Sequence, residues 1–209
     1  VDLTFFAANS TKLLHGGWVA VLMAVVVFVI MSTWYRGREI LSERLKSVSQ
    51  PLNEFLNTIR TGGVIRVPGT AIFMTRNINR TPTAMAHNVK HNKVVHKTAI
   101  MLMVQTEEIP YVTSEDRITI DDMGDGFFQL NLRYGFMESP SVPDILEQLK
   151  SRFGYDVHDI TFFFGRETLI ATDKPGMALW RESLFVFMST NALRATAFYG
   201  IPAEQVIEI

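Results

Sequence analysis

The sequence predicts one transmembrane α-helix followed by a cytoplasmic α/β domain with a mixed β-sheet. Three observations predict this fold class. An uncharged apolar run of membrane-spanning length lies near the start of the 209-residue chain. Arginines follow that run closely, and short apolar runs alternate with amphipathic stretches over the remaining sequence.

The apolar run extends from Gly16 to Tyr35 and contains no charged side chain. As a helix it covers about 30 Å, which is the thickness of the hydrocarbon core of a bilayer. Its valines, with one leucine, one phenylalanine and one isoleucine, favour insertion by about 3–5 kcal/mol. Trp18 lies at one end and Trp34 at the other, as interfacial aromatic residues do. Residues 16–35 are therefore predicted to be a transmembrane helix, with a buried helix of a soluble domain as the alternative.

The charges beside this run give it an orientation. Arg36, Arg38 and Arg44 follow the run, whereas only Lys12 precedes it. A signal peptide has the opposite arrangement, with its positive charge before the apolar run. The positive-inside rule therefore predicts that residues 36–209 are cytoplasmic.

The segments on either side of the helix differ in character. Residues 1–15 are too short to fold alone, and we expect them to be the end of an extracytoplasmic loop from another membrane segment. The chain begins with Val1 rather than methionine, so we expect it to be processed or cut from a longer protein. Residues 36–61 have apolar residues at helical spacing on both sides of Pro51, which predicts a broken amphipathic connector. The connector lies either on the membrane surface or against the domain formed by residues 62–209.

The predicted domain begins with a βαβ unit. Residues 70–75 and 98–104 are short apolar runs typical of strands buried on both faces, and residues 82–92 between them can form a helix. Residues 118–120 and 128–134 alternate apolar and polar side chains. The sequence DDMGDG between them predicts a hairpin turn, because aspartate and glycine favour the positive φ angles of tight turns. A calcium site is not favoured, because the sequence lacks the twelve-residue loop and closing glutamate of an EF-hand.

The alternation continues towards the end of the chain. Ser141 is expected to cap the next helix, residues 160–165 to form a buried strand, and residues 167–171 to pair back on it. A helix then opens at Pro175-Gly176, and its apolar stripe is expected to belong to the core. The stripe consists of Met177, Trp180, Leu184, Phe187 and Met188. The last residues, QVIEI, read as a short strand.

Composition excludes several functions. The net charge of −1 gives no electrostatic basis for binding nucleic acid. The chain has no cysteine, which excludes disulfides, thiolate metal sites and cysteine nucleophiles.

The sequence HNVKHNKVVH at 87–96 contains the most suggestive side chains. His87 and His91 are four residues apart, so they share a helix face and are candidate metal ligands. The stretch contains no carboxylate as a third ligand, and its lysines oppose a bound cation. A basic surface facing an anion, a membrane or a partner is therefore favoured over a metal site, and a purely structural transition from helix to loop remains the simplest interpretation.

Catalytic templates are missing from the sequence. It contains no GxSxG elbow, no GxxxxGK[ST] phosphate loop and no GxGxxG fingerprint. Two charged pairs do not require a catalytic role. Arg166 and Glu167 are explained as an exposed pair at a glycine turn, and Arg181 and Glu182 are expected to be solvated on the outer side of their helix. We therefore expect no catalytic residues, no cofactor-binding residues, no cofactor and no enzyme activity.

Several motifs together resemble a known family. FFAANSTKLLHGGW, the valine-rich run and WYRGRE look like the last membrane helix of bacterial Kup potassium uptake proteins, of the KUP/HAK/KT potassium transporter family. The resemblance continues through further motifs in the same order: RVPGTAIFMT (66–75), HNVKHNKVVH (87–96), DDMGDGFFQLNLRYGFME (121–138), FFFGRETLI (162–170), GMALWRESLFVFMSTNA (176–192) and FYGIP (198–202).

The resemblance implies a multi-pass protein of the bacterial inner membrane, with about twelve membrane helices in inverted repeats and potassium uptake coupled to protons. The C-terminal portion is then cytoplasmic and could regulate, stabilise or dimerise the transporter. Transport sites of such proteins lie among earlier helices, so we expect no transport-site residue in this chain. Expected partners are potassium, protons and the lipid bilayer. The competing hypothesis is a membrane-anchored sensor that binds a metal or a nucleotide.

Overall fold

A computed structural model describes residues 16–153, 159–165, 176–192 and 195–209. The chain forms two compact units. The first contains residues 1–44 and 169–192, and the second contains residues 45–168 and 193–209.

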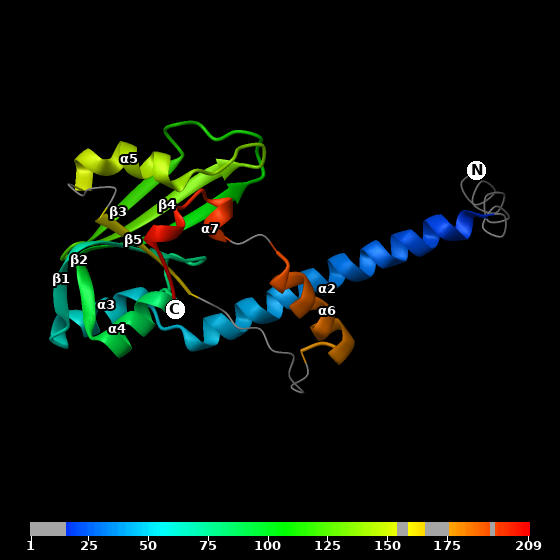
Figure 1. The fold of residues 1–209 in the computed structure, drawn as a ribbon, viewed down its shortest axis with the longest axis horizontal. Helices are drawn as coiled ribbons and strands as arrows, with labels where there is room; N and C mark the ends of the chain where they lie inside the picture. The colour runs from blue at the N-terminus through cyan, green and yellow to red at the C-terminus, as the bar shows by residue number, and fades with distance from the viewer. Residues whose placement is uncertain (1–15, 154–158, 166–175, 193–194) are drawn as a thin grey trace. The chain divides into compact units, whose positions relative to one another are not determined.

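The first unit is built on a single long helix. Helix α2, Trp18–Val48, continues without a break through the apolar run and the arginines that follow it (Figure 1). Its segment Trp18–Arg44 is long and apolar enough to cross a membrane. Only 6% of the most apolar part of this segment is buried, whereas the core helix of a soluble domain buries most of its apolar side chains. The predicted helix is therefore confirmed, and its exposed valines fit an apolar surrounding.

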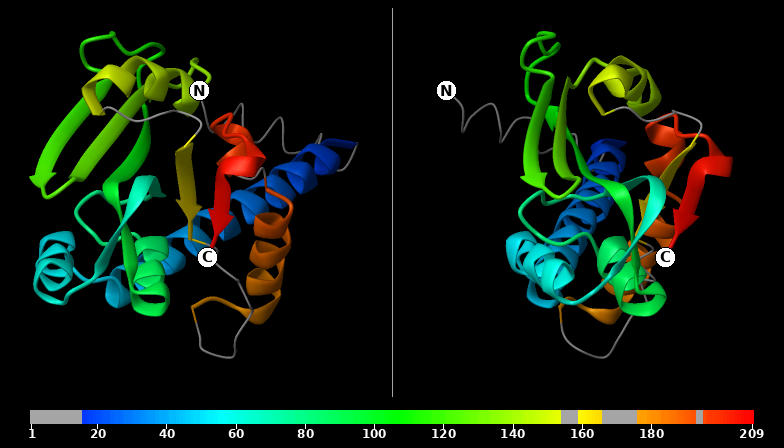
Figure 2. Two further views of the ribbon diagram at one scale, coloured as in Figure 1. Left: turned by 60° about the vertical axis from the view of Figure 1, so that its left-hand side comes forward. Right: turned by 90° about the vertical axis from the view of Figure 1, so that its left-hand side faces the viewer.

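The second unit contains a six-stranded sheet in the order β3-β4-β2-β1-β5-β6. Among the strands that the structure describes, only the β3–β4 pair is antiparallel, so the sheet is mixed, as predicted. β5 and β6 lie side by side at one edge (Figure 2). The strands are β1 Ile65–Met74, β2 Val94–Glu107, β3 Ile118–Gly124, β4 Phe127–Gly135, β5 Ile160–Phe164 and β6 Val206–Glu208. The helices of this unit are α3 Leu52–Thr61, α4 Thr83–Asn92, α5 Val142–Phe153, α7 Ala195–Phe198 and the 3-10 turn η3 Ala203–Gln205.

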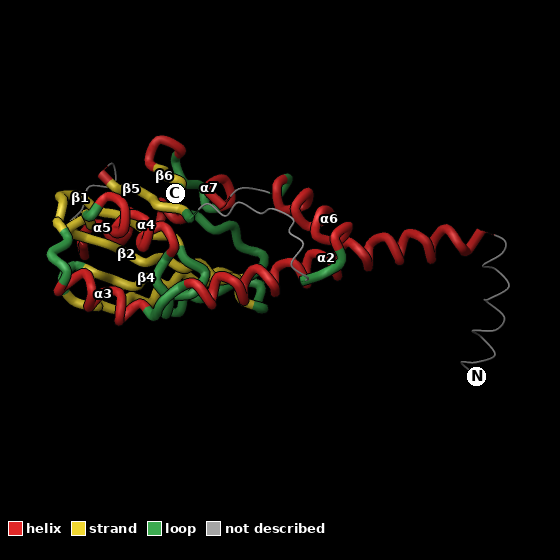
Figure 3. The backbone as a smooth tube through the Cα atoms, turned by 90° about the horizontal axis from the view of Figure 1, so that it is seen from below, coloured by secondary structure: helices red, strands yellow, loops and turns green. Residues whose placement is uncertain are grey.

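Both faces of the sheet are covered. Helices α3 and α4 lie on one face (Figure 3), and α5 lies on the other. In the central strand β1, Ala71 and Phe73 enter the core under α3 and α4, whereas Ile72 between them enters the core under α5. Neighbouring side chains of a strand point to opposite faces, so a strand buried on both faces must be apolar at every position. This explains the continuous apolar runs and confirms the βαβ unit β1–α4–β2, whose strands are parallel.

The hairpin between β3 and β4 is also confirmed. Asp125 and Gly126 form its two-residue turn with φ angles of 53° and 76°. Two consecutive positive φ angles define a type I′ turn, which favours Asp-Gly and matches the twist of the strands. Gly126 is further required by space, because a Cβ there would lie 2.1 Å from the carbonyl oxygen of Lys97.

The position of helix α3 shows whether the connector lies on the membrane surface or against the domain. Its buried side chains Leu52, Phe55, Leu56 and Ile59 belong to the core beneath the sheet. The second half of the connector therefore packs on the domain rather than lying on a membrane surface.

Helix α6, Leu179–Thr190, differs from its prediction and belongs to the first unit. Trp180 is 58% exposed and Phe187 is 66% exposed, so the expectation that they lie in the core is wrong. Phe185 is the buried side chain of this helix. The expected strand at 167–171 and the pair Arg166 and Glu167 lie outside the described residues.

Candidate functional site

The segment that joins helix α2 to α3 is clamped to the loop before α4. The carbonyl oxygen of Gln50 accepts hydrogen bonds from both the backbone N–H and the hydroxyl of Thr81, each at 3.1 Å. The Arg80 guanidinium donates to the carbonyl oxygen of Ser49, and the N–H of Leu52 donates to Asn79 at 3.1 Å. These bonds satisfy backbone groups that a break between two helices would leave unpaired. The connector is thereby fixed to the second unit immediately after α2.

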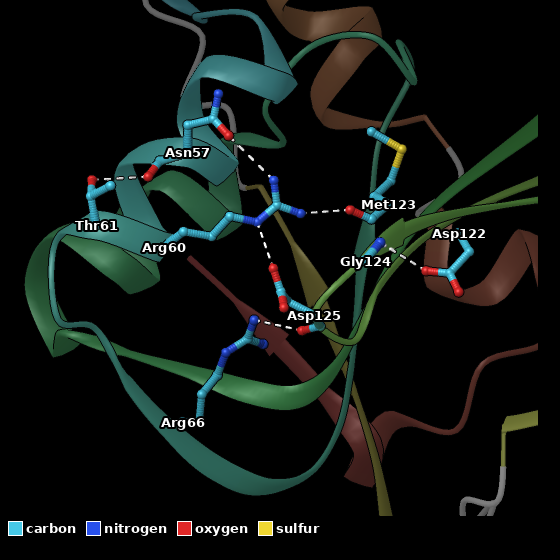
Figure 4. Close-up of polar contacts among 8 residues, drawn as sticks. All are labelled: Asn57, Arg60, Thr61, Arg66, Asp122, Met123, Gly124 and Asp125. Atoms are coloured by element: carbon cyan, nitrogen blue, oxygen red, sulfur yellow. Dashed lines mark hydrogen bonds and ion pairs between the residues drawn. The ribbon is translucent and has the colours of Figure 1, made fainter.

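A second set of polar contacts fixes the other end of α3 (Figure 4). Arg60 donates to the Asp125 carboxylate at 2.7 Å, to the carbonyl oxygen of Met123 at 2.6 Å and to Asn57 at 3.2 Å. An arginine that bonds a carboxylate and a carbonyl at once holds both in one geometry. Helix α3 is therefore attached to the β3–β4 hairpin as well as to the loop before α4.

Arg66 supports the same turn from strand β1. It donates to the carbonyl oxygen of Asp125 at 2.7 Å and to that of His96 at 2.8 Å, and its guanidinium lies 4.1 Å from the Phe127 ring centroid. Desolvation lowers the pKa of Arg66 from its ordinary value, although Asp125 opposes this shift. The hairpin turn is thus surrounded by two arginines that bond its own backbone, and both have a structural role.

The metal candidates His87 and His91 lie on one face of α4, as their spacing predicts. Their ring centroids are 6.0 Å apart and both side chains are exposed. Among the described residues, no group of three histidine, aspartate or glutamate side chains could hold a metal ion. The hypothesis of a metal-binding sensor therefore gains no support from the geometry.

The motif around these histidines has a local structural explanation. Asn88 is buried, donates to the carbonyl oxygen of Val94 at 3.1 Å and accepts a hydrogen bond from Asn92 at 2.7 Å. Lys93 then adopts a left-handed conformation with φ of 59°, which ends the helix. The asparagines thus direct the chain from α4 into β2.

His96 lies on β2 beside the Phe163 ring, with 5.8 Å between centroids. Burial lowers the pKa of His96, and the charge of Asp159 opposes this effect. Its Nδ1 atom is buried and has no hydrogen-bond partner among the described residues. The neutral form of the ring is therefore favoured.

Helix α6 is attached to the end of the membrane-length helix through a polar contact that the sequence did not indicate. Arg181 donates to the hydroxyl of Thr33 at 3.0 Å and to that of Ser32 at 3.4 Å, and Thr33 is fully buried. The prediction that Arg181 is a solvated residue on the outer side of its helix is therefore wrong. Its partners lie 148 and 149 positions away in the sequence, so local spacing cannot predict this contact. The signal that could have indicated it is the pair of hydroxyl groups, Ser32 and Thr33, near the end of an otherwise apolar run.

Two family models match the chain. The model of the K+ potassium transporter C-terminal domain matches residues 68–209, and the model of the K+ potassium transporter integral membrane domain matches residues 1–39. Their order along the chain agrees with a membrane helix followed by a folded domain. No solved structure matches the chain.

Curated relatives match along the whole chain. The probable potassium transport system protein Kup of Myxococcus xanthus strain DK1622 is 47% identical over 100% of this chain, which covers 32% of that relative. Kup 1 of Geobacter sulfurreducens is 45% identical over 100% of the chain and 33% of the relative. Kup 2 of Chromobacterium violaceum is 42% identical over 100% of the chain and 34% of the relative. The chain therefore spans about a third of the length of the relatives it matches.

Proposed function

Because this chain belongs to the family of Kup-type potassium transporters and corresponds to their C-terminal part, we propose that its protein takes up potassium together with protons. The ion path lies in membrane helices outside this chain. Residues 16–35 are the last span of a multi-pass protein of the bacterial inner membrane, and residues 36–209 are cytoplasmic. The family matches and the charge bias of the residues beside the span support this proposal.

The cytoplasmic domain regulates transport by constraining the end of the last span. The observation that supports this role is the clamp on the connector, where Thr81 and Arg80 hold the carbonyl groups of Gln50 and Ser49. These residues follow α2 directly, and α3 after them is inserted in the core of the sheet. A domain that binds a partner differently in two states of the transporter can shift the balance between those states through such a connection.

The clamp is tested in the full-length transporter with the double variant Arg80→Gln and Thr81→Val. The first change removes the bond to Ser49, and the second removes the hydroxyl while keeping the shape of the side chain. The matched control is Lys150→Gln on α5, whose exposed side chain forms a 3.7 Å ion pair with Glu147. We expect the double variant to change rubidium uptake per transporter at matched membrane levels, with the control unchanged.

Removal of residues 62–209 distinguishes regulation from stabilisation. A regulatory domain predicts altered uptake per transporter, whereas a scaffold predicts lower abundance with unchanged uptake per transporter. Equal uptake by the double variant, the control and the unmodified protein over a range of potassium concentrations would refute coupling through the clamp. Cross-linking of the transporter in membranes tests the homodimer, which is the third role considered for the domain.

A further inference from the structure

The inner face of helix α6 is fixed to one short section of α2. The rings of Phe185 and Trp34 are 5.6 Å apart, and Phe185 packs so closely on Gly37 that a Cβ there would lie 2.3 Å from the ring. Arg181, one turn earlier on the same side of α6, donates to Thr33. All of these contacts lie where the apolar run of α2 ends. Helix α6 is therefore held at the level of the membrane boundary.

The opposite face of α6 is apolar and exposed. Leu179 is 58% exposed, Trp180 58% and Phe187 66%. With 3.6 residues in each turn, these three positions fall within about 100° of one another and face away from Arg181 and Phe185. The helix thus has a large apolar surface on the side that does not contact α2.

The hydroxyl groups between these apolar side chains are already satisfied within the helix. Ser183 donates to the carbonyl oxygen of Leu179 at 3.1 Å, and Thr190 donates to that of Val186 at 2.9 Å. A polar group costs little in an apolar surrounding when it is hydrogen-bonded. The charged residues of α6 lie outside this face, because Arg181 is on the opposite side of the helix and Glu182 is about 60° beyond Leu179, away from Trp180 and Phe187. This face can therefore leave water without losing hydrogen bonds.

The bilayer is the partner that fits this surface best. Trp34 marks the level where hydrocarbon gives way to headgroups, and Arg36 and Arg38 follow it on the cytoplasmic side. A tryptophan and large aliphatic or aromatic side chains on one side of a helix are typical of helices that lie in the membrane interface. Contacts between membrane helices depend on small residues that let two backbones approach closely, whereas Leu179, Trp180 and Phe187 are large and project from this face, and Ser183 and Thr190 bond their own helix.

We propose that α6 is an interfacial membrane helix whose outer face, formed by Leu179, Trp180 and Phe187, inserts into the cytoplasmic leaflet beside the end of the last span. The proposal depends on the span being in a bilayer and is independent of potassium uptake. It also gives residues 179–190 a membrane role although they follow the sheet strand β5 in the sequence.

Single cysteines test the proposal, because the chain has none of its own. Leu179→Cys and Phe187→Cys are labelled with the fluorophore NBD in the full chain and in a full-length transporter freed of other cysteines. Both are reconstituted in phosphatidylcholine–phosphatidylglycerol vesicles. The matched control is Glu147→Cys on α5, an exposed position of another helix. Quenching by nitroxide-labelled lipid is compared with quenching by aqueous iodide.

We expect nitroxide lipid to quench the labels at 179 and 187 several-fold more than the label at 147, and iodide to show the reverse order. Equal access of iodide to all three labels would place α6 in water and overturn the proposal. Labels at 179 and 187 that neither quencher reaches in the full-length transporter would show that other protein segments cover this face, which also overturns it. Neither result depends on whether rubidium uptake responds to the clamp, so the two proposals fail separately.

Discussion

Replacement of Gly126 by alanine tests the hairpin turn most directly. Gly126 has φ of 76°, and the added Cβ would lie 2.1 Å from the carbonyl oxygen of Lys97. The left-handed conformation costs a residue with a Cβ about 1–2 kcal/mol. Relief of the contact requires the backbone to move by about 1 Å, which at overpacked sites costs a further 1–3 kcal/mol or so.

The sum predicts that Gly126→Ala lowers the free energy of unfolding by about 2–5 kcal/mol. The movement also strains the hydrogen bond from the N–H of Ala99 to the carbonyl oxygen of Gly126, which is 2.8 Å long. Against a typical domain stability of about 5–15 kcal/mol, this is a large share of the total.

Gly63→Ala is the matched control. Gly63 has φ of 66° but no atom within 4 Å of an added Cβ, so it incurs the conformational cost alone, about 1–2 kcal/mol. Both substitutions are made with Ala71→Cys as reporter, since Ala71 is fully buried in β1 and the chain has no other cysteine. The rate of thiol labelling in increasing urea gives the free energy of unfolding in detergent. Equal losses in the two variants would refute the close contact between the turn and β2.

Three further predictions concern other contacts. Glu138 accepts hydrogen bonds from the N–H groups of Gly135 and Val112 and from Arg117, and these bonds lower its pKa. Its carboxylate therefore stabilises the fold at pH values above the ordinary glutamate pKa, and this stabilisation is lost as the pH falls through the lowered pKa. Glu138→Gln should flatten the dependence of stability on pH at the acid end. Urea unfolding at a series of pH values measures this dependence. Gly37→Leu should separate α6 from α2, because the new side chain occupies the position of the Phe185 ring, and loss of a cross-link between cysteines introduced in the two helices would detect this. Thr81→Val alone should lower the free energy of unfolding by about 1 kcal/mol, since it removes one neutral hydrogen bond and keeps the backbone bond to Gln50, and an unchanged urea midpoint would contradict this.

Much of the sheet could be predicted because its local patterns agree with its long-range contacts. Ile72 and Phe73 are adjacent and both fully buried, since each faces a different helical layer. A strand that is buried on both faces excludes polar side chains at every position, so it appears in the sequence as a continuous apolar run. The turn at Asp125 and Gly126 was equally clear, because few residue pairs adopt two positive φ angles.

Helix α6 could not be predicted in the same way. Apolar residues surround most of its circumference, so its sequence defines a helix but does not identify which face is buried. The choice of Phe185 over Phe187 is made by Gly37, which leaves room for one ring, and Gly37 lies far away in the sequence. The sequence around Arg181 predicts a solvated side chain, because its hydroxyl partners on α2 lie 148 and 149 positions away. Contacts of this kind depend on the three-dimensional arrangement and leave no periodic pattern.

The positions of the aromatic residues on α2 and α6 have an optical consequence. The chain has three tryptophans, and all of them, Trp18, Trp34 and Trp180, lie on these two helices. The unit that contains the sheet has none, and its aromatic chromophores are tyrosines and phenylalanines. Emission excited selectively from tryptophan therefore reports on the two helices of the first unit, and unfolding of the sheet can leave it unchanged. One unmodified sample thus carries a tryptophan signal that is confined to the first unit, whereas four of its five tyrosines, all except Tyr35, lie in the unit that contains the sheet.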